Sequence, residues 1–291
     1  MRSIGYTEIN KKPSTRGVTR TRASTALGLA IPVVPLILFL PTAGFVFLAA
    51  GIAALAGWEW LALDHDRTGW VGRLAYSLVI FLLVFGVWLI ESLWPFVMVC
   101  ALGLWCVLLG RIVIGAGRGL NPSFTAGYGL GIAVIVPGPV ALTIIHGTVS
   151  SGPLLVLVFC IIVWSGDIFA YFIGRAWGTR KLALAISPGK TLEGTLGGVA
   201  GAVVAGMLCY GLWHTSGALA VFSSETWLVM VISVSVVSVV GDLAESVVKR
   251  NAGQKDSGSL LPGHGGVLDR VDGLLSSAPI LGVWLIALGV F

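Results

Sequence analysis

The residues from Ser246 to Asp272 form the most charge-dense segment of an otherwise apolar region. These 27 positions hold three of the thirteen Asp and Glu residues, four of the eighteen Lys and Arg residues and one of the four His residues. The segments on both sides are strongly apolar, so the charges lie at the end of segments suited to a bilayer. Charged groups in such a place are costly to insert, and they are usually retained for a function.

Two carboxylate pairs lie at helical spacing in and beside this segment. Asp242, Glu245 and Lys249 are three and four residues apart, which puts them on one side of a helix. Asp269 and Asp272 can likewise share a face at the start of the last apolar segment. Clustered carboxylates repel one another unless a cation or proton neutralises them, and such hard oxygen ligands suit Mg²⁺. The alternative is a set of interfacial carboxylates paired with Lys249, Arg250 and Arg270.

A glycine-rich loop joins the two pairs. It contains Lys255 and Asp256, then Gly258, and then His264 within a run of glycines. Glycines let backbone N–H groups approach an anion closely, and nearby cations add donors, so the loop suits polyphosphate. His264 could donate to a phosphate, carry a proton or stabilise a turn.

The composition indicates an integral membrane protein. Of 291 residues, 56% are hydrophobic and 11% are charged, against roughly 25% charged in an average soluble domain. The net charge is +5, but the cations are spread over short loops, which favours headgroup contact over a nucleic-acid partner. The four cysteines lie in apolar runs without CxxC spacing, so we expect buried thiols.

Spanning helices need about 20 mostly apolar residues. By this rule the sequence predicts an all-α polytopic bundle of nine helices, near 24–40, 42–62, 74–91, 93–110, 126–146, 153–173, 195–214, 225–246 and 273–291. Pro137 and Pro139 fall inside the fifth span and should kink it. Residues 1–23 would be a basic cytoplasmic tail, and residues 24–291 one membrane domain.

The positive-inside rule supports this count. With the N-terminus in the cytoplasm, all eighteen Lys and Arg residues fall on the cytoplasmic side. An error of one span before residue 170 would scatter them over both faces. Asp167, Asp242 and Glu245, which lie near the ends of the sixth and eighth spans, then point to the same face.

A second polar segment, residues 174–194, lies on that face as well. Its Gly189-Lys190-Thr191 is similar to the end of a P-loop, but Leu184 stands where the first glycine should be, so it is not a Walker A motif. Ser187, Lys190, Thr191 and Glu193 could bind a phosphate or a base. The alternative is an ordinary set of helix start signals.

The pattern over 246–272 resembles the C-terminal signature of the phosphatidate cytidylyltransferases, also known as CDP-diacylglycerol synthases. The matching positions are Ser246, Lys249, Arg250, Lys255, Asp256, Gly258, Leu261, Pro262, His264, Gly265, Gly266, Asp269, Arg270 and Asp272. The stretch from Gly241 to Glu245 and the run SPGKTLEG are also similar to that family. Ile168 departs from it, since a small or hydroxyl residue often follows the aspartate there, which leaves Asp167 itself as the candidate.

The resemblance implies that CTP and phosphatidic acid give CDP-diacylglycerol and pyrophosphate for phospholipid biosynthesis, with a requirement for Mg²⁺. We expect a multi-pass protein of the inner, cytoplasmic membrane, with active-site loops 174–194 and 246–272 on the cytoplasmic side. Whether a second cation shares the site, and whether the chain forms a homodimer, stays open.

The resemblance and the charge pattern together suggest roles for individual residues. Our hypothesis assigns metal binding to Asp242, Asp269 and Asp272. The further catalytic candidates are Lys249, Lys255, Asp256, His264 and Arg270. The substrate-binding candidates are Asp167, Ser187, Lys190, Thr191, Glu245, Ser246, Arg250, Gly265 and Gly266.

Four other functions compete with this one. A secondary transporter would place its charges near the bilayer midplane and would repeat broken helices in two halves, and neither feature is seen. An enzyme with the CDP-alcohol motif is excluded, because Asp272-Gly273 continues as Leu274-Leu275. A scaffold would leave the acidic cluster unexplained. A cytidylyltransferase for another lipid phosphate stays open, because the motif cannot separate it.

Overall fold

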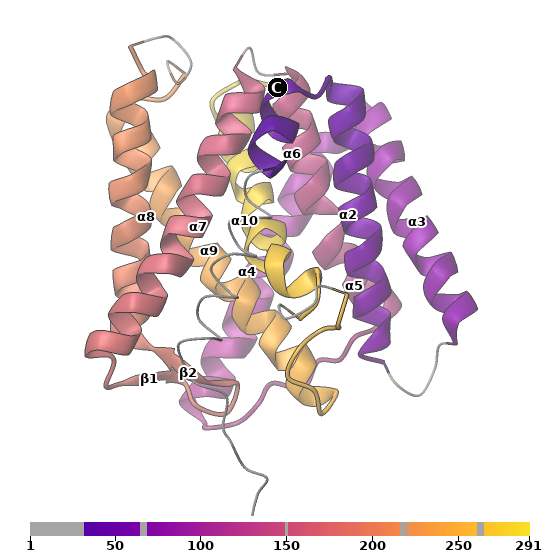
Figure 1. Cartoon of the computed structure of the whole chain (residues 1–291), viewed down its shortest axis with the longest axis vertical. Helices are drawn as coiled ribbons and strands as arrows, with labels where there is room; N and C mark the ends of the chain where they lie inside the picture. Colours follow the sequence, from indigo (N-terminus) through magenta and orange to yellow (C-terminus); the bar gives the residue numbers. More distant parts are fainter. Residues whose placement is uncertain (1–31, 65–68, 149–150, 216–218, 220, 261–264) are drawn as a thin grey trace, which may run out of the picture.

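The structure is a computed structural model that describes residues 32–64, 69–148, 151–215, 219, 221–260 and 265–291. Over these ranges the chain is a helical bundle with one short hairpin (Figure 1). Residues 32–39 are helical. The elements after them are α2 (Thr42–Ala62), α3 (Trp70–Leu89), the 3₁₀ turn η1 (Glu91–Leu93), α4 (Trp94–Gly117), α5 (Tyr128–Ile135), α6 (Pro137–Thr148), α7 (Gly152–Trp177), β1 (Lys181–Ala183), β2 (Ser187–Thr191), α8 (Leu192–Trp213), α9 (Ser224–Asn251) and α10 (Leu268–Ala287).

Eight helical segments of the described chain are long and apolar enough to cross a membrane. They match the second to the ninth predicted spans, so the all-α polytopic fold is confirmed. The first predicted span, 24–40, begins outside the described residues, and only its part 32–39 is seen as helix. The basic tail 1–23 lies entirely outside them, so the division into tail and membrane domain stays a prediction.

The fifth span is broken at its prolines, as predicted. Helix α5 ends at Ile135 and α6 begins at Pro137. Proline has no backbone N–H and its ring displaces the preceding turn, so the helix cannot continue unchanged. The start of α6 packs tightly on α10, because a side chain at Gly138 would lie 2.7 Å from Leu275 Cα.

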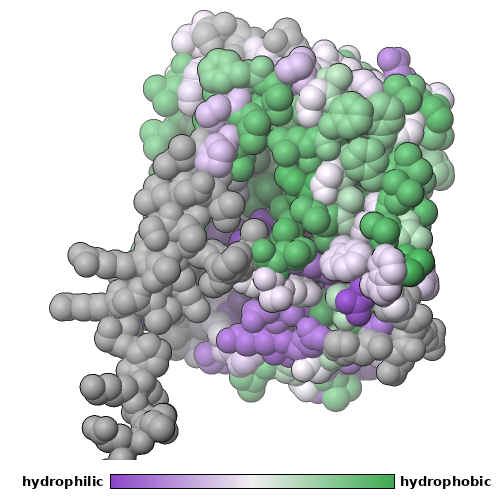
Figure 2. Space-filling model, turned by 45° about the vertical axis from the view of Figure 1, so that its right-hand side comes forward, coloured by the Kyte–Doolittle hydropathy of each residue, from purple (hydrophilic) through white to green (hydrophobic). Residues whose placement is uncertain are grey.

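The surface separates into an apolar band and a polar end. Figure 2 shows hydrophobic residues over the middle and upper part of the molecule and hydrophilic residues gathered at the lower end. Helix α3 illustrates the band, since Leu74, Leu78 and Leu82 are all exposed. Large apolar side chains exposed in this number suit contact with lipid.

Both predicted active-site segments reach the polar end. The closest helix pairs are α7 with α8, α2 with α3, and α9 with α10. The turn from α7 to α8 is the antiparallel β1–β2 hairpin, which pairs Lys181 with Thr191 and Ala183 with Ser187. In Figure 1 the hairpin and the loop after α9 lie at the same lower end of the bundle. The fold therefore brings residues 174–194 together with the described part of 246–272.

Candidate active site

Helices α9 and α10 cross closely because both carry glycine at the contact. A side chain at Gly241 would lie 2.8 Å from the Asp272 carbonyl oxygen, and one at Gly273 would lie 2.5 Å from Ser238 Oγ. Only glycine permits this approach. The residues beside these glycines, Asp242 and Asp272, consequently lie close enough to interact electrostatically.

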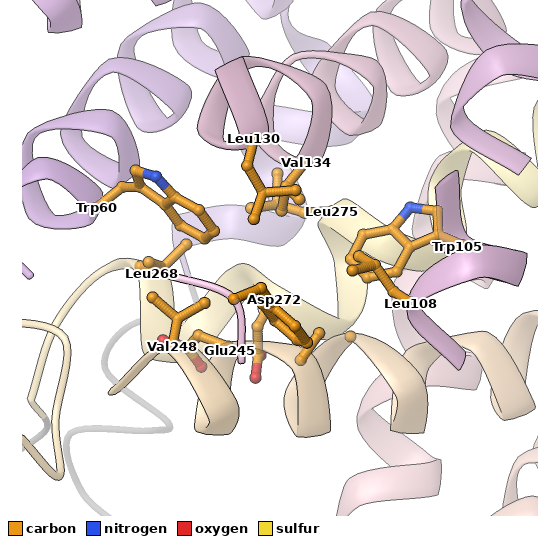
Figure 3. Close-up of a pocket in the computed structure, with 13 residues that line it drawn as sticks. Trp60, Trp105, Leu108, Leu130, Val134, Glu245, Val248, Leu268, Asp272 and Leu275 are labelled. Carbon is orange, nitrogen blue, oxygen red and sulfur yellow. The ribbon is translucent and has the colours of Figure 1, made fainter. Parts of the chain in front are cut away.

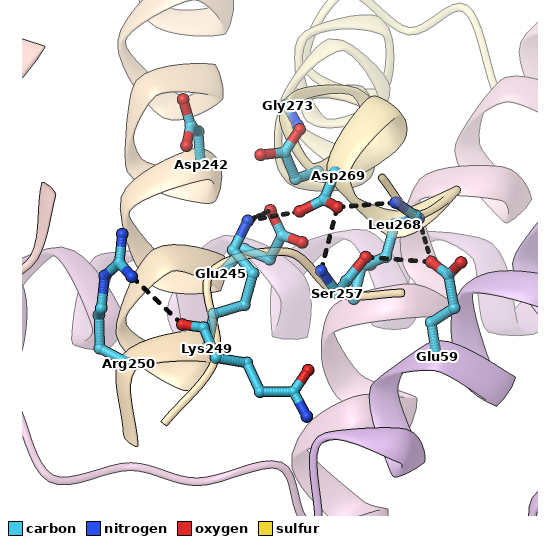
Figure 4. Close-up of polar contacts among 12 residues, drawn as sticks. Glu59, Asp242, Glu245, Lys249, Arg250, Ser257, Leu268, Asp269 and Gly273 are labelled. Atoms are coloured by element: carbon cyan, nitrogen blue, oxygen red, sulfur yellow. Dashed lines mark hydrogen bonds and ion pairs between the residues drawn. The ribbon is translucent and has the colours of Figure 1, made fainter. Parts of the chain in front are cut away.

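Lys249 binds two carboxylates in the interior of the site. Its Nζ donates to Glu245 Oε2 at 3.0 Å and to Asp269 Oδ1 at 2.5 Å (Figure 4). The prediction that Glu245 and Lys249 share one side of a helix is confirmed. Lys249 is 9% exposed, and a charge at such a depth is stabilised only when opposite charges surround it.

Asp269 holds the two ends of the glycine-rich loop together. Its Oδ2 accepts hydrogen bonds from Ser257 N at 3.0 Å and from Gly266 N at 2.9 Å. With Lys249 on Oδ1, both oxygens of Asp269 have protein donors. Gly265 is adjacent in a left-handed conformation, with φ at 81°, and a side chain there would lie 2.8 Å from Asp269 Oδ2.

A more accessible group lies where the hairpin meets α9. Lys190 of β2 forms an ion pair with Asp242, and their side chains are 23% and 39% exposed. Asp167 of α7 interacts electrostatically with Asp242, Lys190 and Arg270. Asp272 interacts with both Asp242 and Asp167. Four separate elements thus place three aspartates and two cations within electrostatic range, and Lys190 and Asp242 are in direct contact.

Hydrogen bonds within the hairpin region set the position of Lys190. The Glu193 carboxylate accepts from the backbone N–H groups of Thr179 and Arg180 at 3.1 Å and from Arg180 Nε at 3.0 Å. Thr191 Oγ1 accepts from Gly194 N at 3.1 Å, so Thr191 is the N-cap of α8. Arg250 Nε donates to Ile186 O at 3.4 Å and links α9 to the hairpin.

The remaining candidates lie around this centre. Lys255 and Asp256 are exposed and line an open surface depression with Gln254, Gly258 and Ser259. Ser246 is buried on α9, and Ser187 begins β2. His264 lies outside the described residues. The roles assigned to these residues stay predictions.

An apolar cavity lies behind the carboxylates. It is formed by α2, α4, α5, α9 and α10, and its walls include Trp60, Trp105 and Leu130, with Glu245 and Asp272 at one side (Figure 3). Glu245 and Asp272 lie within range of electrostatic interaction. Glu245 Oε1 is buried and has no partner among the described residues.

One residue of the site was missed from the sequence. Glu59 of α2 is 1% exposed and accepts hydrogen bonds from Ser257 Oγ at 3.1 Å and from Leu268 N at 2.8 Å (Figure 4). The signal was available, because Glu59 is a carboxylate inside an apolar span, like Asp167. Its partners follow it by about 200 positions, and no spacing rule links them.

The donor groups at this site fit a hard cation. Asp242 and Asp272 are neighbouring carboxylates, and the buried Glu245 Oε1 beside Asp272 has no described partner. Such groups are stabilised by a divalent cation with oxygen preference. Within the described residues, however, no three acidic, His or Cys side chains are gathered tightly enough to form a complete metal site. Further ligands would have to come from substrate phosphates and water.

Comparison with known proteins gives a consistent result. The profile of the cytidylyltransferase family matches residues 20–288. A phosphatidate cytidylyltransferase of Brucella abortus is 38% identical over 240 residues, covering 82% of this chain and 83% of the relative. One of Pseudomonas aeruginosa is 35% identical over 253 residues, covering 84% and 89%. One of Thermotoga maritima is 43% identical over 117 residues, covering 40% and 43%. Matches of this extent show that the chain belongs to the cytidylyltransferase family.

Proposed function

We propose that the chain transfers the cytidylyl group of CTP to phosphatidate, forming CDP-diacylglycerol and pyrophosphate. The relatives that it matches over most of its length bear the name of this activity. The observation that carries the proposal is the ion pair of Lys190 with Asp242 at the polar end of a membrane bundle, with Asp167, Asp272 and Arg270 within electrostatic range. A water-soluble polyphosphate and a lipid headgroup can both reach such a place.

The reaction needs positioning and charge neutralisation more than a strong base. A phosphate oxygen of phosphatidate attacks the α-phosphorus of CTP, a new P–O bond forms, and the bond to the β-phosphate oxygen breaks. The attacking oxygen is already anionic at neutral pH, so no side chain has to remove a proton. The main barrier is repulsion between two polyanions, which fixed cations lower. Lys190, Arg270, Lys255 and Arg250 are the cations that we assign to this task.

Mg²⁺ is part of the proposal. Asp242 and Asp272 would hold it, with Asp269 as the third predicted ligand, and the bound ion would neutralise phosphate charge. Asp269 is engaged by Lys249, Ser257 and Gly266 in this structure, so we assign it first to holding the loop. Lys249 keeps Glu245 and Asp269 in place and compensates their charge.

The same proposal includes the location of the enzyme. We place it in the inner, cytoplasmic membrane with the N-terminus and the site on the cytoplasmic side. The support is the positive-inside rule, because the described Lys and Arg residues lie in the segments that close the polar end. CTP is then available on the side where the site opens.

The direct test is product formation by the purified protein in liposomes. With CTP, Mg²⁺ and phosphatidate we expect CDP-diacylglycerol and pyrophosphate in equal amounts. Omission of phosphatidate, or replacement of CTP by ATP, should abolish both products. Equal or faster transfer to another lipid phosphate would favour the related cytidylyltransferase, and absence of pyrophosphate with every lipid would refute the proposal.

A further inference from the structure

Glu59 is a buried carboxylate in a helix that is otherwise apolar. It lies near the end of α2, and its side chain is almost completely shielded from solvent, with 1% exposed. A carboxylate in a spanning helix is costly to insert and is retained for a reason. Its burial therefore calls for hydrogen-bond donors around its carboxyl group.

The first partner is the beginning of α10. Leu268, the first residue of that helix, donates its backbone N–H to Glu59 Oε2 at 2.8 Å. The first N–H groups of a helix have no partner within the helix. The residue before α10, Val267, has no side chain that can cap it. Glu59 thus supplies from α2 the acceptor that is missing locally, and a negative charge at a helix N-terminus is favourable.

The second partner is the glycine-rich loop. Ser257 Oγ donates to the same Glu59 oxygen at 3.1 Å, while Ser257 N donates to Asp269. Ser257 is 1% exposed and follows directly on Lys255 and Asp256. One buried serine therefore connects the carboxylate of α2 with the carboxylate of α10, and it holds the end of the segment that carries Lys255.

Two glycines of the loop leave room for the Glu59 side chain. A side chain at Gly258 would lie 2.6 Å from Glu59 Oε1, and one at Gly266 would collide with both Ser257 Oγ and the Glu59 carboxyl group. Two glycines of the 246–272 segment thus leave room for a residue that lies about 200 positions earlier in the chain. This steric match argues that the loop and Glu59 form one unit.

From these contacts we propose that Glu59 is a positioning residue of the active site. It caps α10 and holds Ser257, and through them it keeps Asp269, Asp272 and Lys255 in register. It touches neither substrate nor the reacting atoms. The kinetic part of this proposal rests on the proposed function, whereas its structural part does not.

The kinetic test compares Glu59→Ala, Glu59→Gln and Ser257→Ala. Both hydrogen bonds end on one oxygen of Glu59, so the amide oxygen of Gln can accept both, and Glu59→Gln should stay within about threefold of the parent in kcat/KM. Glu59→Ala removes both bonds and should raise the KM for CTP by about tenfold or more, with a smaller rise for phosphatidate. The KM for CTP of Ser257→Ala should lie between those of Glu59→Gln and Glu59→Ala.

Ser235→Ala is the matched control, because Ser235 is also a buried serine, and its hydroxyl donates to Val231 O of its own helix. It should leave both KM values unchanged. An equal rise in the KM for both substrates, or parent-like constants in Glu59→Ala, would overturn the positioning role. An equal loss of kcat/KM in Glu59→Gln and in Glu59→Ala would also overturn it.

A second measurement is independent of catalysis. Amide hydrogen exchange in 253–260 and at the start of α10 should be faster in Glu59→Ala than in Glu59→Gln, with α7 unchanged. If the parent makes no CDP-diacylglycerol, the proposed function fails while this measurement still decides the positioning role. If Glu59→Ala does not fold, the same exchange comparison uses Ser257→Ala against Ser235→Ala. Unchanged exchange in the loop would overturn the proposal.

Discussion

An ion pair connects the β1–β2 hairpin with α9. Lys190 comes from the β1–β2 hairpin and Asp242 from α9. Both side chains are partly exposed, so solvent screens their attraction and the pair contributes little to stability. We infer that Lys190 binds substrate phosphate. Before a polyanion or a cation binds, the ion pair neutralises the negative charge of Asp242.

Substitution of Lys190 should therefore affect binding more than folding. We expect Lys190→Ala to raise the KM for CTP by about tenfold, because a fixed cation near phosphate is lost, with little change in thermal unfolding. The control is Lys181→Ala in the partner strand, which removes an exposed lysine of the same hairpin. Steady-state kinetics and melting curves of both variants provide the check. An equal KM for CTP in Lys190→Ala and Lys181→Ala would contradict a phosphate-binding role for Lys190.

At the scale of elements, the crossing of α9 and α10 determines the geometry of the site. Gly241 and Gly273 let the helices approach, and Ser276 and Ser277 turn their hydroxyls to Gly273 O at 3.0 and 2.5 Å. Asp242 and Asp272 sit beside this contact. Their distance therefore depends on two residues that have no side chain.

Gly273→Ala should separate the helices. Overpacking of a tight contact typically costs about 1 to 3 kcal/mol, so we expect lower thermal stability and a marked fall in kcat. Gly211→Ala in α8 is the control, since a side chain there would meet nothing within 4 Å, and alanine favours a helix. Activity and melting temperature should be measured together. A parent-like Gly273→Ala would show that the close crossing is not needed.

Elements differ in how well the sequence predicts them. The spans are predictable because apolar length is a local property, and the pairing of Glu245 with Lys249 follows from helical phase. The β1–β2 hairpin was expected only as a polar loop, since its three- and five-residue strands have no alternating pattern. The contact of Glu59 with Ser257 and Leu268 depends on how distant helices pack, which no local rule contains.

At the scale of the whole molecule, polarity divides the protein into two parts with different tasks. The apolar band of Figure 2 faces lipid, and the polar end gathers charge from the hairpin, α7, α9 and α10. The apolar cavity beside Glu245 and Asp272 is small, about 10 Å³, and is lined mainly by apolar side chains of the bundle. A lipid phosphate and a soluble nucleotide can meet at such a boundary, and neither part alone could bind both.

The central claim is that the carboxylates at the polar end carry the chemistry, and a matched pair of variants of α9 tests it most directly. Asp242→Asn alters the polar end, while Glu225→Gln alters an exposed carboxylate in the first turn of the same helix. Formation of CDP-diacylglycerol from CTP and phosphatidate should be measured in liposomes over a range of Mg²⁺ concentrations. We expect Asp242→Asn to lose at least about a hundredfold in kcat/KM and Glu225→Gln to match the parent. Comparable activity of the two variants would contradict the account.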